Sequence, residues 1–201
     1  MDSPWAVIVL AAGKGSRFQG VQHKLAQELS HSSVLGTTLR HAIASGLSVV
    51  VVTTATFAEQ ARSIVAARDV IVLPEVGTPD QPLLGMGYSI AAGVSACPDA
   101  SGWLVLPGDM PLVQPATLQA VAHKLDEHLV VFAQYKGRRG HPVGFAAELY
   151  SELVTLTGDE GARRLAARFP AIGLEVDDPG VLVDVDTQDD LESVRRSELT
   201  L

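Results

Sequence analysis

The chain has 201 residues, of which 47% are hydrophobic and 19% charged, and its formal net charge is -8. This composition argues against disorder, and the acidic balance disfavours nucleic acid or an anionic membrane as a partner. The length suits one domain over residues 1–201. We expect no signal peptide and no membrane span, because no apolar run has the required length. Cys97 is the lone cysteine, which excludes an intrachain disulfide and suggests a cytoplasmic protein.

Apolar strand-like segments alternate with amphipathic helical segments along the chain. This alternation predicts an α/β fold with a mostly parallel sheet covered by helices on both faces. Turn residues at 136–142 predict a hairpin or an excursion from the sheet, with residues 143–145 returning to it. Thr187 is expected to cap the last helix. The expected strands are 5–11, 48–54, 70–74, 103–106, 129–135, 172–176 and 181–185, and the expected helices are 34–45, 57–67, 86–96, 117–127, 147–156, 160–168 and 189–198.

The loop after the first expected strand carries the first chemical signal. Residues 9–25 read Val-Leu-Ala-Ala-Gly-Lys-Gly-Ser-Arg-Phe-Gln-Gly-Val-Gln-His-Lys-Leu. Glycines let backbone N–H groups approach an anion closely. Lys14, Arg17 and Lys24 add positive charge in a stretch with no Asp or Glu between positions 2 and 28. The stretch therefore predicts a phosphate site.

Two common phosphate-binding loops are excluded here. A dinucleotide-binding G-x-G-x-x-G that begins at Gly13 needs glycine at position 18, which is Phe18. A P-loop needs glycine at position 8 and Ser or Thr at position 15, where the chain has Ile8 and Gly15. An ordinary strand-to-helix turn explains Gly13 and Gly15 alone, but it does not explain the full pattern with its cations.

Carboxylates follow two other expected strands. Asp109 comes just after the strand at 103–106, and ligands of open α/β sheets bind beyond the carboxyl ends of the strands. Asp184 and Asp186 alternate with valines, so we expect both on one face of a strand, where their repulsion favours a nearby cation. A turn or a helix cap is the alternative for Asp109. Eight acidic residues lie between Glu175 and Glu192, and most of them, Asp178 included, are read as a solvated face or as helix caps. Because Mg²⁺ takes carboxylates together with substrate phosphates, we predict Mg²⁺ bound by Asp109, Asp184 and Asp186.

Six segments in order resemble the signatures of MobA-like NTP transferases, over residues 6 to about 191. The resemblance implies a Rossmann-like three-layer α/β/α fold of the GT-A-like type. Gln188 stands where this family usually has proline, which affects the start of the last helix more than the ligands. The six segments are Leu-Ala-Ala-Gly-x-Gly-x-Arg-Phe-x-Gly followed by Lys24, Gly85-x-x-x-Ser89-Ile-x-x-Gly, Leu-Pro-Gly-Asp-Met-Pro at 106–111, Gly-x-x-Gly-His-Pro at 137–142, Gly-Asp-x-Gly-Ala-Arg at 158–163, and Asp-Val-Asp-Thr at 184–187.

The resemblance also implies roles for individual residues. Arg17, Lys24 and Asp109 are the expected catalytic residues, and Lys136 belongs to a second basic cluster suited to a phosphate on the acceptor. We do not assign His141 as a base. The expected nucleotide-binding residues are Leu10, Ala11, Ala12, Gly13, Gly15, Ser16, Arg17, Lys24, Gly85, Ser89 and Asp109. The expected acceptor-binding residues are Arg139, Gly140, His141 and Pro142.

Ala12 makes the first motif more similar to the cytidylyltransferase branch than to the guanylyltransferase branch, which has Leu-Ala-Gly-Gly. The hypothesis is a Mg²⁺-dependent transfer of CMP from CTP to a phosphorylated acceptor, with release of pyrophosphate. The acceptor that the resemblance implies is molybdopterin carrying molybdenum, with a molybdoenzyme as a possible transient partner. Guanylyl transfer, another acceptor such as a sugar phosphate or phospholactate, and a cofactor carrier with little turnover are the alternatives.

Overall fold

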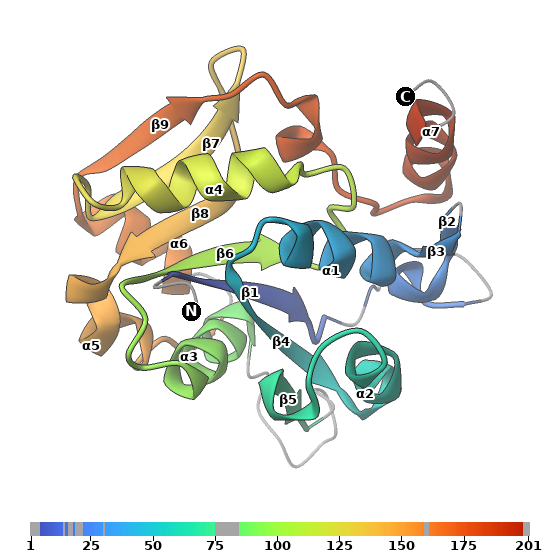
Figure 1. Ribbon diagram of the computed structural model, residues 1–201, viewed down its shortest axis with the longest axis horizontal. Coiled ribbons are helices and arrows are strands. Elements are labelled where there is room, and N and C mark those ends of the chain that lie inside the picture. The colour runs from blue at the N-terminus through green and yellow to red at the C-terminus, as the bar shows by residue number, and fades with distance from the viewer. Residues whose placement is uncertain are drawn as a thin grey trace.

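The computed structural model describes residues 5–13, 15, 18, 22–29, 31–74, 85–158 and 161–198, with the backbone alone at 161, 162, 164 and 198. Its main sheet has the strand order β5-β4-β1-β6-β8-β7-β9 (Figure 1). The strands are β1 (Trp5–Ala11), β2 (Glu28–Leu29), β3 (Ser32–Ser33), β4 (Ser48–Thr54), β5 (Val70–Leu73), β6 (Gly102–Pro107), β7 (Val130–Tyr135), β8 (Arg138–Ala146) and β9 (Ala171–Glu175). The α-helices are α1 (Val34–Ala44), α2 (Ala55–Arg62), α3 (Gly85–Ala96), α4 (Pro115–Lys124), α5 (Tyr150–Leu153), α6 (Gly161–Arg168) and α7 (Gln188–Glu198).

The sheet is mostly parallel, as predicted, and β8 is its antiparallel member. β1 pairs in parallel with both β4 and β6, and β7 pairs in parallel with β9. β8 runs antiparallel to β6 and β7 because a tight turn sends the chain straight back. Lys136 and Gly137 in that turn have positive φ angles of 50° and 72°, the conformation of a two-residue hairpin. The predicted hairpin is confirmed, and it stays within the sheet.

Successive side chains along the strands pack alternately into two hydrophobic cores, one on each face of the sheet. On β1, Val7 and Val9 pack into the core beneath α1, α2, α4 and α7, whereas Ala6 and Ile8 pack into the core beneath α3, α5 and α6. Fully burying one such aliphatic side chain contributes about 1.5–3 kcal/mol. The sheet is therefore covered on both faces, which gives the expected three layers of helix, sheet and helix.

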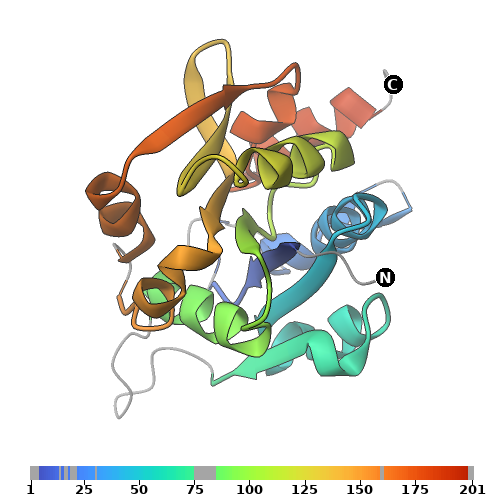
Figure 2. The same cartoon turned by 60° about the vertical axis from the view of Figure 1, so that its left-hand side comes forward.

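The β7–β8 hairpin and β9 form one end of the molecule in both views (Figures 1 and 2). β2 and β3 form a second, two-stranded sheet just before α1, which the sequence patterns did not predict. In the part of the chain that the structure describes, no helix combines the length and the hydrophobicity needed to cross a lipid bilayer.

The strand expected at 181–185 is wrong. Residues Pro179–Leu182 form a 3-10 helix, and an extended segment leads from it to α7. The side chain of Asp178 accepts the N–H of Gly180 at 2.9 Å, and Pro179 cannot donate to a sheet ladder. These two effects start a turn where the apolar pattern alone indicated a strand.

Other boundaries differ from the expected ones by a few residues. The helix expected at 147–156 is a 3-10 turn at Ala147–Leu149 followed by the single turn of α5. Thr187 caps α7 as predicted, since its hydroxyl accepts the N–H of Asp190 at 3.2 Å and the Asp190 carboxylate accepts the Thr187 N–H at 2.7 Å. This is a reciprocal capping arrangement.

Candidate active site

The carboxyl ends of β1 and β6 lie side by side, because Leu10 and Pro107 are partners in a parallel ladder. The N–H of Gly108 then donates to the carbonyl of Leu10 at 2.8 Å. A Cβ at position 108 would lie 3.0 Å from that carbonyl oxygen, which favours glycine there. The glycine-rich loop after β1 and the Asp109 turn after β6 therefore leave the sheet at the same place.

The segment before α7 reaches this edge of the sheet through its backbone. The N–H of Val185 donates to the carbonyl of Asp109 at 2.9 Å. As a result, carboxylate oxygens of Asp109, Asp184 and Asp186 all lie within 4.8 Å of one another. The two aspartates meet Asp109 even though they are not on a strand.

Lys24, in the 3-10 helix Lys24–Ala26, lies between two of these carboxylates. Its Nζ donates to Oδ2 of Asp109 at 2.5 Å and to Oδ1 of Asp186 at 2.6 Å, and the residue is only 9% exposed. Burial by itself lowers the pKa of Lys24, but the hydrogen bonds and charges of Asp109 and Asp186 outweigh it and raise the pKa above its ordinary value. The lysine is therefore fully charged at neutral pH.

Among the described residues, no cation forms an ion pair with the third carboxylate, Asp184. Burial and then the charges of Asp186 and Asp109 raise its pKa. Oδ1 of Asp109 is buried and has no hydrogen-bond partner in the described part of the chain. Hard carboxylate oxygens, mutual repulsion and a buried unpaired acceptor are the features that a divalent cation resolves, so these three residues fit a metal ion.

In the described part of the glycine-rich loop, Gly13 and Gly15 lie next to the ring of His23. Gly15 has φ of +59°, and a Cβ there would lie 2.7 Å from His23 Nε2, so a glycine is required twice over. At Gly13 a Cβ would contact nothing within 4 Å. Leu10, Ala11 and Ala12 occupy the end of β1 and the first loop position. Ser16 and Arg17, predicted to bind the nucleotide, lie outside the described residues, as does Lys14.

His23 is a residue of this loop that sequence reasoning did not single out. Its Nδ1 accepts the N–H of Leu25 at 3.2 Å, which leaves Nε2 to donate to the carbonyl of Gly13 at 3.1 Å. The edge of the ring packs on Phe57, with centroids 4.9 Å apart. The ring thus ties the loop to the turn that carries the catalytic lysine candidate. No spacing in the sequence indicated this, because the contact depends on the path of the loop.

Two amide replacements separate the two bonds of His23. His23→Gln can still reach Gly13, whereas His23→Asn keeps an acceptor near Leu25 but is too short for the loop. We expect His23→Asn to raise KM for the nucleotide about fivefold, the value of one net hydrogen bond of roughly 1 kcal/mol, with a smaller change in kcat. His23→Gln should stay close to wild type. Equal KM values for the two variants, measured by steady-state kinetics, would contradict this role.

The start of α3 packs against Gly158, which begins the segment 158–163 that resembles a family motif. The N–H of Gly87 donates to the carbonyl of Gly158 at 2.7 Å, and a Cβ at Gly85 would lie 2.4 Å from the Gly158 carbonyl carbon. The glycines therefore allow close backbone packing. Ser89 is buried, at 9% exposure, one turn further along. A nucleotide-binding role for Gly85 and Ser89 stays a prediction.

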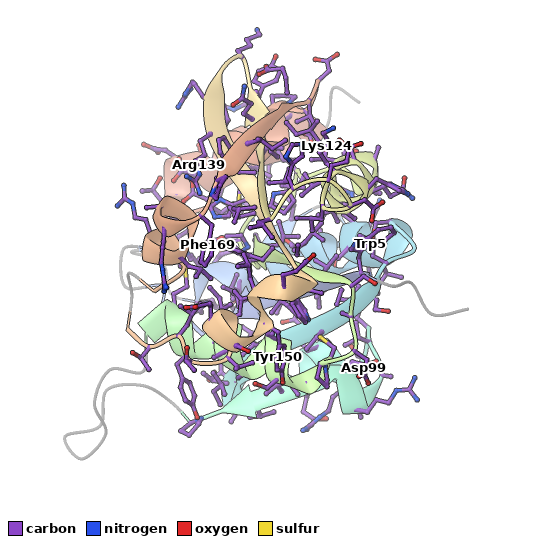
Figure 3. All side chains as sticks on the ribbon, turned by 90° about the vertical axis from the view of Figure 1, so that its left-hand side faces the viewer. Trp5, Asp99, Lys124, Arg139, Tyr150 and Phe169 are labelled. Carbon is purple, nitrogen blue, oxygen red and sulfur yellow. The ribbon has the colours of Figure 1, made fainter. Side chains whose placement is uncertain are left out.

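The segment predicted to bind the acceptor lies on β8. The Arg139 guanidinium stacks on the Phe132 ring at 4.4 Å, and burial, followed by the charge of Arg163, lowers its pKa. In Figure 3, Arg139 and Phe169 lie on the opposite side of the sheet from Lys124. Two guanidiniums that repel each other suit an anion between them.

The other three residues of that segment are largely covered. A Cβ at Gly140 would lie 2.1 Å from the carbonyl oxygen of Val181, so Gly140 lets the 3-10 helix approach β8. Burial lowers the pKa of His141 and outweighs the charge of Asp109, which acts in the opposite direction. The ring is therefore neutral near pH 7. Pro142 is buried, and the His141–Pro142 peptide bond is cis. Contact with an acceptor stays a prediction for all four.

Asp178 is a second residue that the sequence did not mark, because it was read as part of a solvated acidic face. It is only 4% exposed, and its carboxylate accepts the N–H of Gln114 at 2.9 Å and the hydroxyl of Thr117 at 2.6 Å, besides the N–H of Gly180. It therefore braces the chain after Asp109 against the chain before Asp184. The Asp178-Pro179-Gly180 turn was the signal that could have revealed it.

A family model for the MobA-like NTP transferase domain matches residues 7–172. The chain belongs to this family. Proteins whose sequence is similar to this chain differ widely in length. Purine catabolism protein PucB of Bacillus subtilis is 30% identical over 214 residues, covering 98% of this chain and 99% of PucB. The bifunctional protein GlmU of Zymomonas mobilis is 33% identical over 123 residues, and the match covers 61% of this chain but only 27% of GlmU.

Solved structures agree with the fold of this MobA-like domain. Rv0371c of Mycobacterium tuberculosis has a TM-score of 0.79 at 28% identity and covers 98% of this chain and 99% of its own. A complex of Rv0371c with manganese has a TM-score of 0.76, also at 28% identity, and covers 96% of this chain and 98% of its own. A nucleotidyl transferase from Methanothermobacter, at 24% identity and a TM-score of 0.77, covers 98% of both chains and supports the fold alone.

Proposed function

We propose that this MobA-like protein is a cytoplasmic, metal-dependent nucleotidyltransferase that joins CMP from CTP to a phosphorylated acceptor and releases pyrophosphate. The observation that carries the proposal is the contact of Lys24 with Asp109 and Asp186 at the mouth of a glycine-rich loop. This contact supports the proposal, because a cation suited to a triphosphate and carboxylates suited to a metal meet at one point of the sheet edge. The manganese complex of Rv0371c supports the metal, and we propose Mg²⁺ as the ion used here.

The chemistry requires positioning and charge neutralisation more than proton transfer. A phosphate on the acceptor is already ionised at neutral pH, so it can attack the α-phosphorus of CTP in line without a general base. The neutral His141 is not needed as one. Lys24, Arg17 and the N–H groups of the loop would offset charge on the departing pyrophosphate. Bound Mg²⁺ would neutralise the phosphates, held by Asp109, Asp184 and Asp186.

The acceptor is proposed from the basic side chains on β8 and α6. Arg139, with Arg163 nearby, suits the phosphate of an acceptor, and we propose molybdopterin carrying molybdenum in that place. Handing the product to a molybdoenzyme is the matching proposal for a partner. The acceptor and the partner are both proposed from the sequence motifs. The preference for CTP is proposed from Ala12 in the first motif.

Thermal shift with nucleotides tests the choice of base. We expect CTP with Mg²⁺ to raise Tm by several degrees and GTP with Mg²⁺ to raise it less, because a ligand stabilises the fold in proportion to its affinity. EDTA should remove most of the gain, since the triphosphate then loses its cation. Stabilisation by GTP and none by CTP would reject the cytidylyl assignment. Pyrophosphate release with each NTP and each candidate acceptor then separates a transferase from a carrier, which would bind its cofactor without turnover.

A further inference from the structure

The ammonium of Lys24 lies between two of the three carboxylates that fit a metal ion. It lies 2.5 Å from Oδ2 of Asp109 and 2.6 Å from Oδ1 of Asp186, and the three side chains are 11%, 16% and 15% exposed. Short charge-assisted hydrogen bonds of this kind are strong. A divalent cation binds carboxylate oxygens at about 2.0–2.6 Å, so an ion held by Asp109 and Asp186 would compete with Lys24 for the same two carboxylates.

The charges of Lys24 and the three carboxylates do not balance. One ammonium offsets only part of the charge of three clustered carboxylates. The cluster therefore still attracts a cation while Lys24 is in place. Removing Lys24 from Asp109 and Asp186 without a new partner would leave a buried charge unpaired, which is costly. A triphosphate at the loop mouth supplies that partner.

We propose that Lys24 is the resident counter-ion of the metal site and that it exchanges its carboxylate partners for the triphosphate when the nucleotide and its metal bind. This inference rests on the proposed function. It states that the divalent cation binds weakly to the nucleotide-free protein and enters together with the nucleotide. The competing arrangement keeps Lys24 in place and uses only Asp184 and the unpaired Oδ1 of Asp109 for the ion.

Mn²⁺ binding to the nucleotide-free protein distinguishes the exchange of Lys24 from the arrangement that keeps Lys24 in place. The binding is measured from the electron paramagnetic resonance signal of free Mn²⁺. Lys24→Met removes the charge at similar size, and we expect it to bind Mn²⁺ at least about tenfold more tightly than wild type, or 1.4 kcal/mol. Lys24→Arg keeps the charge and should stay near wild type. Lys124→Met is the matched control, because Lys124 pairs with Glu127 on the surface of α4, and it should leave the affinity unchanged.

A measurement on the wild-type protein covers the case in which Lys24→Met does not fold. Saturating Mn²⁺ should raise the acetylation of Lys24 by acetic anhydride, quantified by mass spectrometry, because the displaced amine loses its carboxylate partners. Acetylation of Lys124 should not change. Equal Mn²⁺ affinity of folded Lys24→Met and wild type overturns the exchange, and so does unchanged labelling of Lys24 at saturating Mn²⁺.

These outcomes are separate from those of the transferase assay. A wild-type protein that releases pyrophosphate while Lys24→Met gains no Mn²⁺ affinity rejects the exchange and keeps the function. A protein that shows the gain in Mn²⁺ affinity but no turnover with any NTP supports the exchange at the site and rejects the function.

Discussion

Asp109→Asn is expected to abolish metal-dependent turnover while leaving the protein folded. The replacement keeps the shape of the side chain and the backbone carbonyl that accepts the N–H of Val185. It removes one of the charges that we propose bind the metal, and it alters the carboxylate that Lys24 contacts. Because a site for a divalent cation depends on ionised oxygen ligands, we expect pyrophosphate release in Mg²⁺ to fall to background.

Asp126→Asn is the matched control for this variant. Asp126 is exposed just after α4, so the control makes the same change of charge away from the site. Both variants should unfold within a few degrees of wild type, as followed by circular dichroism. Turnover of Asp109→Asn close to that of wild type, in a folded protein, would remove Asp109 from the metal site.

Lys24→Ala is expected to lower kcat by about 10²–10³, the usual loss for one preorganised electrostatic donor. The lysine is the described cation closest to the carboxylate cluster, and its pKa is raised despite burial, so it carries its full charge when the pyrophosphate leaves. The same change leaves Asp109 and Asp186 without their shared partner. We therefore also expect a lower Tm without metal, which added Mg²⁺ partly restores.

Steady-state pyrophosphate release and thermal unfolding measure the two effects of Lys24→Ala. Lys124→Ala serves as the control, since it removes a lysine that lies on the other side of the sheet from Arg139 (Figure 3). The loss of kcat should exceed any rise in KM, because the charge on the leaving group develops in the transition state. A Lys24→Ala variant with wild-type kcat would show that Lys24 only keeps the carboxylates apart.

The metal cluster could be foreseen only in part. Asp109 was found because a carboxylate after a strand of an α/β sheet meets a ligand by topology. Asp184 and Asp186 were found by their alternation with valines, although the strand on which that argument relied is a 3-10 helix and an extended segment. The three carboxylates still come together, because the N–H of Val185 bonds to the carbonyl of Asp109, a contact between residues far apart in the sequence.

Contacts that depend on the path of a loop could not be predicted from the sequence. His23 gave no signal, since its bond to Gly13 exists only once the loop has folded back. Asp178 was hidden among other acidic residues, and its burial is decided by α4 and the turn at Pro179 packing around it. The glycines at 85 and 140 are predicted to contact ligands, and that stays a prediction. The structure adds that neighbouring backbone lies within 2.4 and 2.1 Å of a Cβ added at these positions.

The sequence by itself determined the α/β class, the parallel strands, the β7–β8 hairpin and the residue types of the site. These follow from short-range rules, because hydrophobic period, turn chemistry and glycine content act over a few residues. Only the tertiary structure decided that Lys24 lies between Asp109 and Asp186, residues that come from three separate parts of the chain. Packing of both faces of one sheet brings those parts together, and no local pattern encodes the distance between them.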